Sequence, residues 1–116
     1  MNIFWIVVLG VLSLLAFSKG TRIKMFRRDG GACRGCGRLW DDGWMLQGAH
    51  LDHTKNGNYD NVDNGVMLCV ECHLLQHQRL FDEAQTEGER NFHAYAIRKL
   101  GETDPYNWMY YEKARG

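Results

Sequence analysis

The chain has 116 residues, with 14 basic and 14 acidic side chains that give a net charge of zero at neutral pH. This length allows one small domain. The balanced charge, taken alone, argues against a general nucleic-acid binder. Basic side chains are nevertheless concentrated in residues 19–40, where seven of them stand against a single aspartate and leave a local charge of +6. Such a stretch can flank the cytoplasmic side of a membrane anchor or contact phosphates.

An apolar segment precedes this basic stretch, since residues 3–17 contain no charged side chain. With its flanking residues it would rise about 27 Å as a helix, slightly less than a bilayer core. Positive charge follows the segment instead of preceding it, which favours a retained anchor with the domain in the cytoplasm. We therefore predict that residues 1–20 form a hydrophobic helix that anchors the protein in a membrane. The alternatives are a signal-like segment cleaved at Ala16-Phe17-Ser18, with export of the domain, and a helix buried in the domain or in an oligomer.

The remaining elements alternate short helices and strands, as in a small α+β domain. In chain order we expect a helix over 21–28, a strand over 44–51, a turn at 56–58, a strand over 66–68, and helices over 72–81, 89–100 and 105–113. We predict a core domain at 21–85 and a C-terminal helical extension at 86–116. The extension is expected to pack and not to do chemistry, with Phe92, Ala96 and Leu100 on its buried stripe and His93 on its surface.

Two cysteine pairs, Cys33-x-x-Cys36 and Cys69-x-x-Cys72, carry the strongest signal in the sequence. Four thiolates in two such pairs can close a tetrahedral zinc site. Two disulfides are the alternative if the domain is exported, but the Arg, Gly and His residues around the pairs favour zinc. A structural ion of this kind stabilises a small core by about 10 kcal/mol in peptide sites, so loss of one cysteine should unfold the domain.

Histidines outside the zinc site suggest a second metal ion. His73 and His77 are four residues apart on a predicted helix, so their imidazoles project from one face and can share a divalent ion. His50 ends the upstream strand, and the loop that contains Asn64 leads back to the second cysteine pair. A pair of strands that faces one helix can hold a divalent ion over a phosphate when histidines from the strands and from the helix point into the crevice between them.

The sequence resembles the HNH endonucleases that have a ββα-metal core and a four-cysteine zinc clamp. The resemblance is carried by RDGGACRGCG at 28–37, LQGAHL at 46–51, DNGVMLCVECH at 63–73, and His77. It implies that His50 is the general base, that Asn64 orients the loop and this histidine, and that His73 and His77 bind the catalytic metal. The four cysteines are then structural.

The chain departs from the family's pattern at Ala49, where the family usually has an Asp or His metal ligand. Asp52 could substitute from nearby, or Asp52 and His53 could be the working pair. The apolar positions around the motif favour His50, and His53 would face the other way if the strand continued. Gly65 is a smaller departure, because the family commonly has an apolar residue there.

The predicted function is therefore metal-dependent hydrolysis of phosphodiester bonds in nucleic acid, with DNA as the favoured substrate. The expected cofactors are a structural Zn²⁺ and a catalytic Mg²⁺, Mn²⁺, Ni²⁺ or Zn²⁺, with membrane association through residues 3–17. Four arginines are candidates for gripping the phosphate backbone: Arg27, Arg28, Arg34 and Arg38. The alternative is a zinc-knuckle module, tethered to a membrane, that binds nucleic acid without cutting it.

Overall fold

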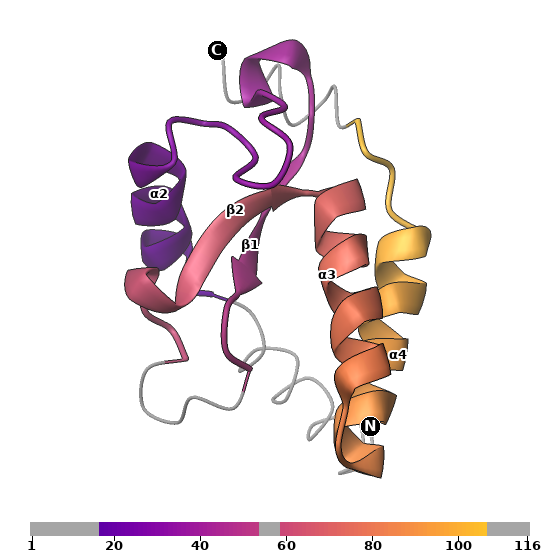
Figure 1. Ribbon diagram of the computed structural model, residues 1–116. Coiled ribbons are helices and arrows are strands. Elements are labelled where there is room, and N and C mark those ends of the chain that lie inside the picture. Colours follow the sequence, from indigo (N-terminus) through magenta and orange to yellow (C-terminus); the bar gives the residue numbers. More distant parts are fainter. Residues whose placement is uncertain (1–16, 54–58, 107–116) are drawn as a thin grey trace, which may run out of the picture.

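The computed structural model describes residues 17–53 and 59–106 (Figure 1). The predicted anchor therefore lies outside the described residues, except for Phe17 and the three residues after it. None of the helices within 17–53 and 59–106 is long and apolar enough to cross a membrane. In chain order the elements are helix α2 (Lys19–Arg28), a 3-10 turn (Trp40–Asp42), strand β1 (Leu46–His50), a 3-10 turn (Val62–Asn64), strand β2 (Gly65–Cys69), and helices α3 (Val70–Glu83) and α4 (Glu87–Gly101).

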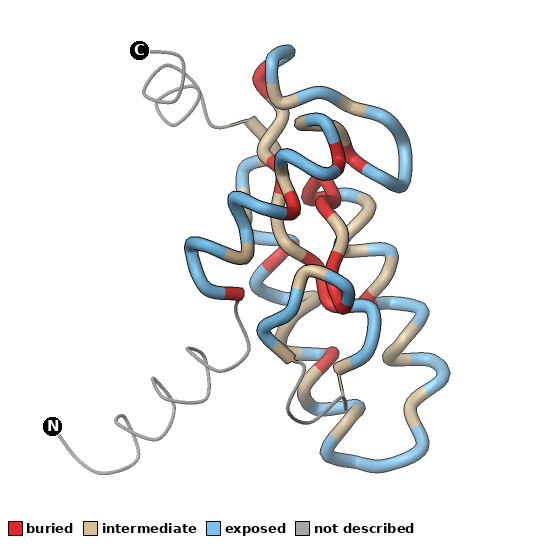
Figure 2. The backbone as a smooth tube through the Cα atoms, turned by 90° about the vertical axis from the view of Figure 1, so that its left-hand side faces the viewer, coloured by how far each residue is buried: buried red, intermediate tan, exposed pale blue. Residues whose placement is uncertain are grey.

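A two-stranded antiparallel sheet stands between the helices, with α2 on one side and α3 and α4 on the other (Figure 1). The register pairs Leu46 with Cys69 and His50 with Gly65. The α+β class and the order of strand, strand and helix are as predicted. Figure 2 shows that buried positions lie along the inside of this arrangement, whereas the outward turns of the helices are exposed.

Two glycines let α2 and the residue before it approach the sheet closely. A Cβ atom at Gly48 would lie 2.8 Å from the Met25 side chain and 3.0 Å from that of Phe17, and one at Gly65 would overlap both. Met25 is fully buried and Phe17 is 4% exposed. Gly65, the smaller departure from the family's pattern, therefore makes room for the core, and Phe17, the last residue of the apolar segment, belongs to that core.

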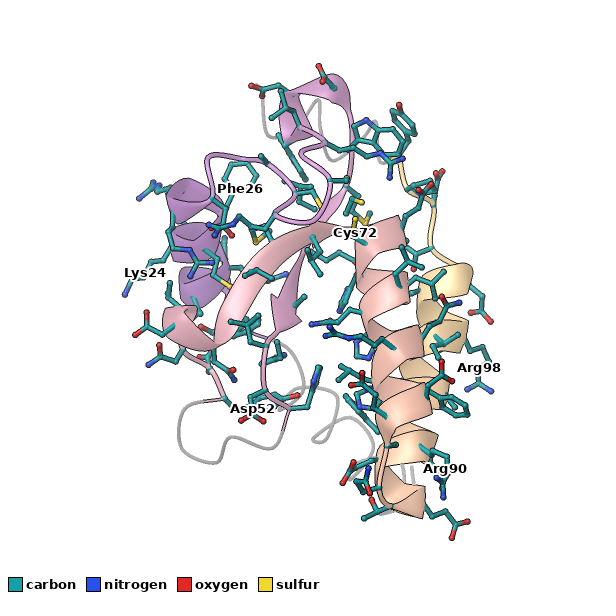
Figure 3. All side chains as sticks on the ribbon, in the orientation of Figure 1. Lys24, Phe26, Asp52, Cys72, Arg90 and Arg98 are labelled. Atoms are coloured by element: carbon teal, nitrogen blue, oxygen red, sulfur yellow. The ribbon has the colours of Figure 1, made fainter. Side chains whose placement is uncertain are left out.

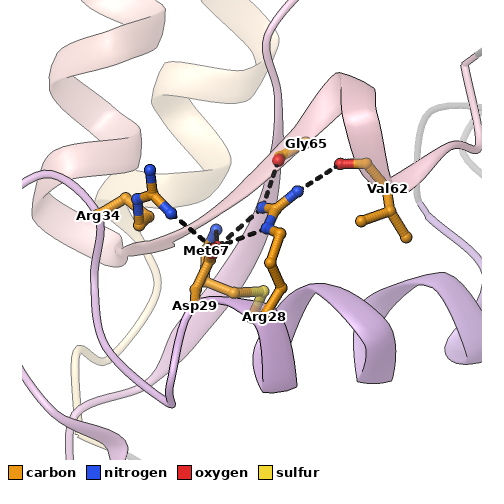
Figure 4. A network of polar contacts seen from close by, with 6 residues as sticks. All are labelled: Arg28, Asp29, Arg34, Val62, Gly65 and Met67. Atoms are coloured by element: carbon orange, nitrogen blue, oxygen red, sulfur yellow. Dashed lines mark hydrogen bonds and ion pairs between the residues drawn. The ribbon is translucent and has the colours of Figure 1, made fainter.

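A buried carboxylate joins the end of α2 to β2 (Figure 4). Asp29 accepts hydrogen bonds from Arg28 Nε (2.8 Å) and Nη2 (3.0 Å), Arg34 Nη1 (3.0 Å) and the backbone N–H of Met67 (2.9 Å). Arg28 also donates to the carbonyls of Val62 and Gly65, each at 2.7 Å. Burial opposes ionisation of Asp29, but its hydrogen bonds from Arg28 and Met67 outweigh this and lower its pKa.

The last two helices pack side by side (Figure 1), and each begins with a side-chain cap. Cys69 Sγ accepts from the Cys72 N–H at the start of α3, and Thr86 Oγ1 accepts from the Glu89 N–H at the start of α4. Figure 3 shows Arg90 and Arg98 pointing outward from α4. His93 does not share that exposure: it is 6% exposed, so its predicted surface position is wrong. The buried face of α4 runs through His93 and Leu100, seven residues apart.

The aromatic segment near the C-terminus only partly falls within the described residues. Its predicted helix over 105–113 lies outside them from residue 107 onward. Tyr106 is not helical: it forms an isolated bridge with Trp44, and the two ring centroids are 4.5 Å apart. Trp44 thus pairs with Tyr106, and β1 begins two residues later at Leu46.

Candidate functional site

The four cysteines meet where the loop after α2 reaches the junction of β2 and α3. Their sulfur atoms all lie within 4.8 Å of one another, and the Cys36 and Cys69 sulfurs are 3.7 Å apart. Zinc–sulfur bonds of about 2.3 Å at tetrahedral angles separate the sulfurs by about 3.8 Å. The four thiols are free, so the geometry fits the zinc clamp and not the pair of disulfides. Figure 3 shows the sulfur atoms gathered beside Cys72 at the start of α3.

Donor groups lie beside two of the four sulfur atoms, those of Cys69 and Cys33. Arg38 Nη1 lies 3.5 Å from Cys69 Sγ and 2.8 Å from a Glu71 carboxylate oxygen, and its guanidinium lies 4.3 Å from the centre of the Trp44 ring. Burial opposes ionisation of Cys33, but backbone N–H groups outweigh it and lower the pKa of its thiol to about 7. A Cβ atom at Gly35 would lie 2.9 Å from Cys72 Sγ, so the clamp requires glycine there.

All five histidines of the chain lie in one connected cluster. Their ring centroids are separated by 4.9 Å for His73–His77, 5.1 Å for His77–His93, 5.2 Å for both His53–His77 and His53–His93, and 5.6 Å for His50–His53. Burial, reinforced by neighbouring imidazoles, lowers the pKa of His73 to about 4 and those of His53 and His77 to about 3. These rings are therefore neutral at neutral pH, with lone pairs available for a metal.

Hydrogen bonds fix which nitrogen of His73 carries the proton. His73 Nδ1 lies 2.8 Å from Gln47 Oε1, and since this oxygen can only accept, Nδ1 is the donor. The lone pair of neutral His73 is then on Nε2, which lies 3.2 Å from His77 Nε2. The other nitrogen of His77, Nδ1, lies 2.9 Å from Nδ1 of His93.

The His73 and His77 pair fits a shared divalent ion. Two nitrogens bound to one ion at 2.0–2.1 Å with a tetrahedral angle lie about 3.3 Å apart, close to the 3.2 Å between the Nε2 atoms. Among the described residues only the four cysteines bring three or more ligand atoms within 4.8 Å of one another. The histidines thus offer two ligands of an open site, and the remaining positions are left for water or substrate oxygen.

His50 lies at the end of β1 with its ring enclosed between two aromatic rings. The centroids of Phe17 and Tyr59 are each 3.8 Å from that of His50, and His50 is 3% exposed. Its Nε2 is 3.0 Å from the carbonyl oxygen of Tyr59, so Nε2 carries the proton and Nδ1 keeps the lone pair. Gln76 of α3 donates to the His50 carbonyl at 2.8 Å and ties the strand end to the helix.

Asn64 holds the chain immediately after His50. Its Oδ1 accepts from the Asp52 N–H and its Nδ2 donates to the Asp52 carbonyl, both at 2.9 Å, while its own carbonyl accepts from Leu51 N–H at 2.9 Å. Asn64 is 2% exposed. These contacts fit the loop-orienting role expected of it.

The chain turns after His50, which changes the position expected for His53. Because β1 ends at His50, the next residues do not continue the strand, and the His53 ring returns to the histidine cluster instead of facing away. Asp52 is exposed, and its backbone is held by Asn64. Ala49, 1% exposed, shares the face of β1 that carries Gln47 toward α3, so a methyl group stands where the family has a ligand.

A cleft of about 430 Å³ opens beside the cluster, between residues 51–53 and the facing ends of α3 and α4. It is lined in part by His53, His93 and Phe92, together with the acidic side chains Asp52, Glu83 and Glu89. These carboxylates attract cations and repel phosphates, so the cleft suits entry of an ion better than docking of a nucleic-acid backbone.

The four arginines predicted to grip phosphates are placed differently from one another. Arg28 is committed to Asp29 and two carbonyls, and Arg38 contacts Cys69, Glu71 and Trp44. The Arg34 side chain contacts Asp29 but is 56% exposed, and Arg27 is exposed on α2. Phosphate binding remains a prediction, and Arg27 and Arg34 are the side chains best placed to provide it.

Comparison with known proteins gives one match. Residues 33–79, which contain both cysteine pairs, β1, β2 and most of α3, match the family model described as HNH endonuclease. No curated protein and no solved structure matches the chain.

Proposed function

Because residues 33–79 of this chain match the HNH endonuclease family model, we propose that it is a metal-dependent endonuclease that hydrolyses phosphodiester bonds in nucleic acid, with DNA as its substrate. The observation that carries this proposal is the facing pair of Nε2 atoms, 3.2 Å apart, on a helix that starts at the zinc clamp. A divalent ion bound there would act as a Lewis acid toward the phosphate.

His50 is the proposed general base. Since its Nε2–H is donated to the Tyr59 carbonyl, Nδ1 is the nitrogen that can take a proton from the attacking water. Burial lowers the pKa of His50, which keeps the ring unprotonated at neutral pH. Asn64 supports this role through its bonds to the two residues after His50 and takes no proton itself.

Phosphate binding is proposed for the outer face of α2 and the loop that carries the first cysteine pair, Cys33 and Cys36. Arg27 and Arg34 are exposed there, and Lys24 points outward from the same helix (Figure 3). Contacts of this kind position a backbone and weaken as salt rises, without reading sequence. Membrane association, with the nuclease in the cytoplasm, stays a proposal that rests on the sequence of residues 3–17.

Ala49 supports a second candidate, a zinc-clamped module that binds nucleic acid without cutting it. The buried methyl group removes a ligand that the family usually supplies on this face of β1. Binding of one ion by two histidines alone would be weaker, and an ion that is not retained cannot act on a phosphate.

A cleavage assay separates the two candidates. The full chain is incubated with plasmid DNA or RNA and with Mg²⁺, Mn²⁺, Ni²⁺ or Zn²⁺, beside His50→Ala and His73→Ala, with Gln78→Ala on the exposed face of α3 as matched control. General acid–base catalysis contributes about 10²–10⁴-fold, so His50→Ala should lose that much rate while Gln78→Ala keeps it. Binding of nucleic acid without cleavage under any metal would favour the binding module. The chain is kept whole, because deletion of residues 1–18 would remove Phe17 from the ring of His50.

A further inference from the structure

We propose that His93, on α4, is a positioning residue for the second metal site: it accepts a hydrogen bond from Nδ1 of His77 and thereby holds the Nε2 lone pair of His77 toward the ion. The inference rests on the proposed function only in taking His73 and His77 as the two ligands. It gives the C-terminal extension, outside the matched residues 33–79, a part in metal binding.

The contact between the two rings is short and buried. The Nδ1 atoms of His77 and His93 are 2.9 Å apart, and the two residues are 3% and 6% exposed. Phe92 borders both rings, with centroid distances of 6.0 Å to His77 and 5.0 Å to His93. Water therefore has little access to Nδ1 of His77, and this nitrogen forms its hydrogen bond with His93.

Each of the two ligands is held in the same way at the nitrogen that faces away from the ion. His73 has Gln47 Oε1 at 2.8 Å from its Nδ1, and His77 has His93 at 2.9 Å from its Nδ1. Metal-binding histidines usually give their second nitrogen such a partner, which fixes the tautomer and the ring orientation. The pair of outer contacts leaves both Nε2 atoms facing each other.

The position of the proton follows from the ligand role. When Nε2 of His77 binds the ion, its ring proton is on Nδ1, which then donates to Nδ1 of His93. His93 must carry its own proton on Nε2, and its place in the lining of the 430 Å³ cleft beside Glu89 gives that N–H polar surroundings. Without the ion, the hydrogen bond between His77 and His93 has the opposite direction: Nδ1–H of His93 donates to His77. Nε2–H of His77 then donates to His73, and Nδ1–H of His73 donates to Gln47.

The test measures binding of the second ion without reference to cleavage. The full chain holding one zinc is titrated with Ni²⁺ by calorimetry, as wild type, His93→Leu and His93→Asn. Leucine removes the acceptor, whereas the Oδ1 of asparagine lies near the place of Nδ1. Loss of an outer contact of this kind weakens metal binding by about 10–100-fold. We expect that loss for His93→Leu and recovery of most of it for His93→Asn, with the first zinc unchanged in both.

Long-range ¹H–¹⁵N spectra of the wild type with a second Zn²⁺ give a readout that does not depend on variants folding. The expected result is a proton on Nδ1 of His77 and on Nε2 of His93. The inference is overturned if Ni²⁺ binds His93→Leu as tightly as wild type, if His93→Asn is as weak as His93→Leu, if His93 itself binds the ion, or if the wild type takes up only one ion. A wild type that binds Ni²⁺ as described but cleaves nothing would refute the nuclease and leave this inference standing.

Discussion

Replacement of Asp29 by alanine tests the account of how α2 is joined to the sheet. The carboxylate has four hydrogen bonds, and its side chain has no exposed area. Its loss leaves the buried N–H of Met67 unpaired, which costs about 1–3 kcal/mol. Arg28 stays tied to the Val62 and Gly65 carbonyls and cannot turn fully to water, which adds a cost of similar size. We therefore expect Asp29→Ala to lower the free energy of unfolding by about 3–5 kcal/mol, the usual result of breaking a buried ion pair.

The assay is urea unfolding at pH 7 with zinc held constant, followed by tryptophan fluorescence. Because the native pKa of Asp29 is lowered, its stabilisation is complete above the unfolded pKa and is lost only as the pH falls through the native value. The measurement at pH 7 therefore captures the whole effect. Arg34→Ala is the matched control: its side chain is 56% exposed, and its removal leaves Asp29 bonded to Arg28 and Met67, so we expect a loss of about 1 kcal/mol or less.

A loss below about 1 kcal/mol for Asp29→Ala would refute this reasoning, because buried donors would then tolerate the missing acceptor. Equal losses in Asp29→Ala and Arg34→Ala would refute it in another way. They would assign the energy to the exposed pair and not to the contacts with Arg28 and Met67.

Two further substitutions test the clamp and the core. Cys69→Ser should reduce bound zinc to below one per chain and unfold much of the domain, as measured by metal analysis and circular dichroism; a folded, zinc-loaded variant would contradict the clamp. Gly65→Ala should cost about 1–3 kcal/mol, because its Cβ would overlap Met25 and Phe17, whereas Gly101→Ala, with open space around its Cβ, should be nearly neutral. Equal stability of these two glycine variants in urea unfolding would show that the core repacks freely.

The sequence alone predicted those features that depend on the spacing of residues near one another in the chain. Cysteine spacing predicted the zinc clamp, and the alternation of apolar residues with turn residues predicted both strands and helices α2, α3 and α4 within a few residues. The i, i+4 spacing of His73 and His77 predicted rings on one face, and their Nε2 atoms do face each other. The roles of these histidines, and that of His50 as base, remain predictions.

What the sequence did not reveal depends on contacts between distant segments. Phe17 reads as the end of an apolar segment, yet it stacks on His50, because two glycines in different strands leave space for it. The position of His93 could have been anticipated from its spacing of seven to Leu100, but the partner it would meet on α3 depends on how the two helices pack.

The zinc clamp and the histidine pair are linked through one sulfur atom. Cys69 Sγ belongs to the clamp and also accepts the Cys72 N–H, so it fixes the first turn of α3. His73 and His77 lie one and two turns further along that helix, and their i, i+4 spacing places their Nε2 atoms together once the helix is formed. Zinc on the four cysteines would order the start of α3 against the sheet, and so orient the helix that brings His73 to Gln47 and His77 to His93. Removal of zinc should abolish binding of the second ion even though neither histidine has been changed.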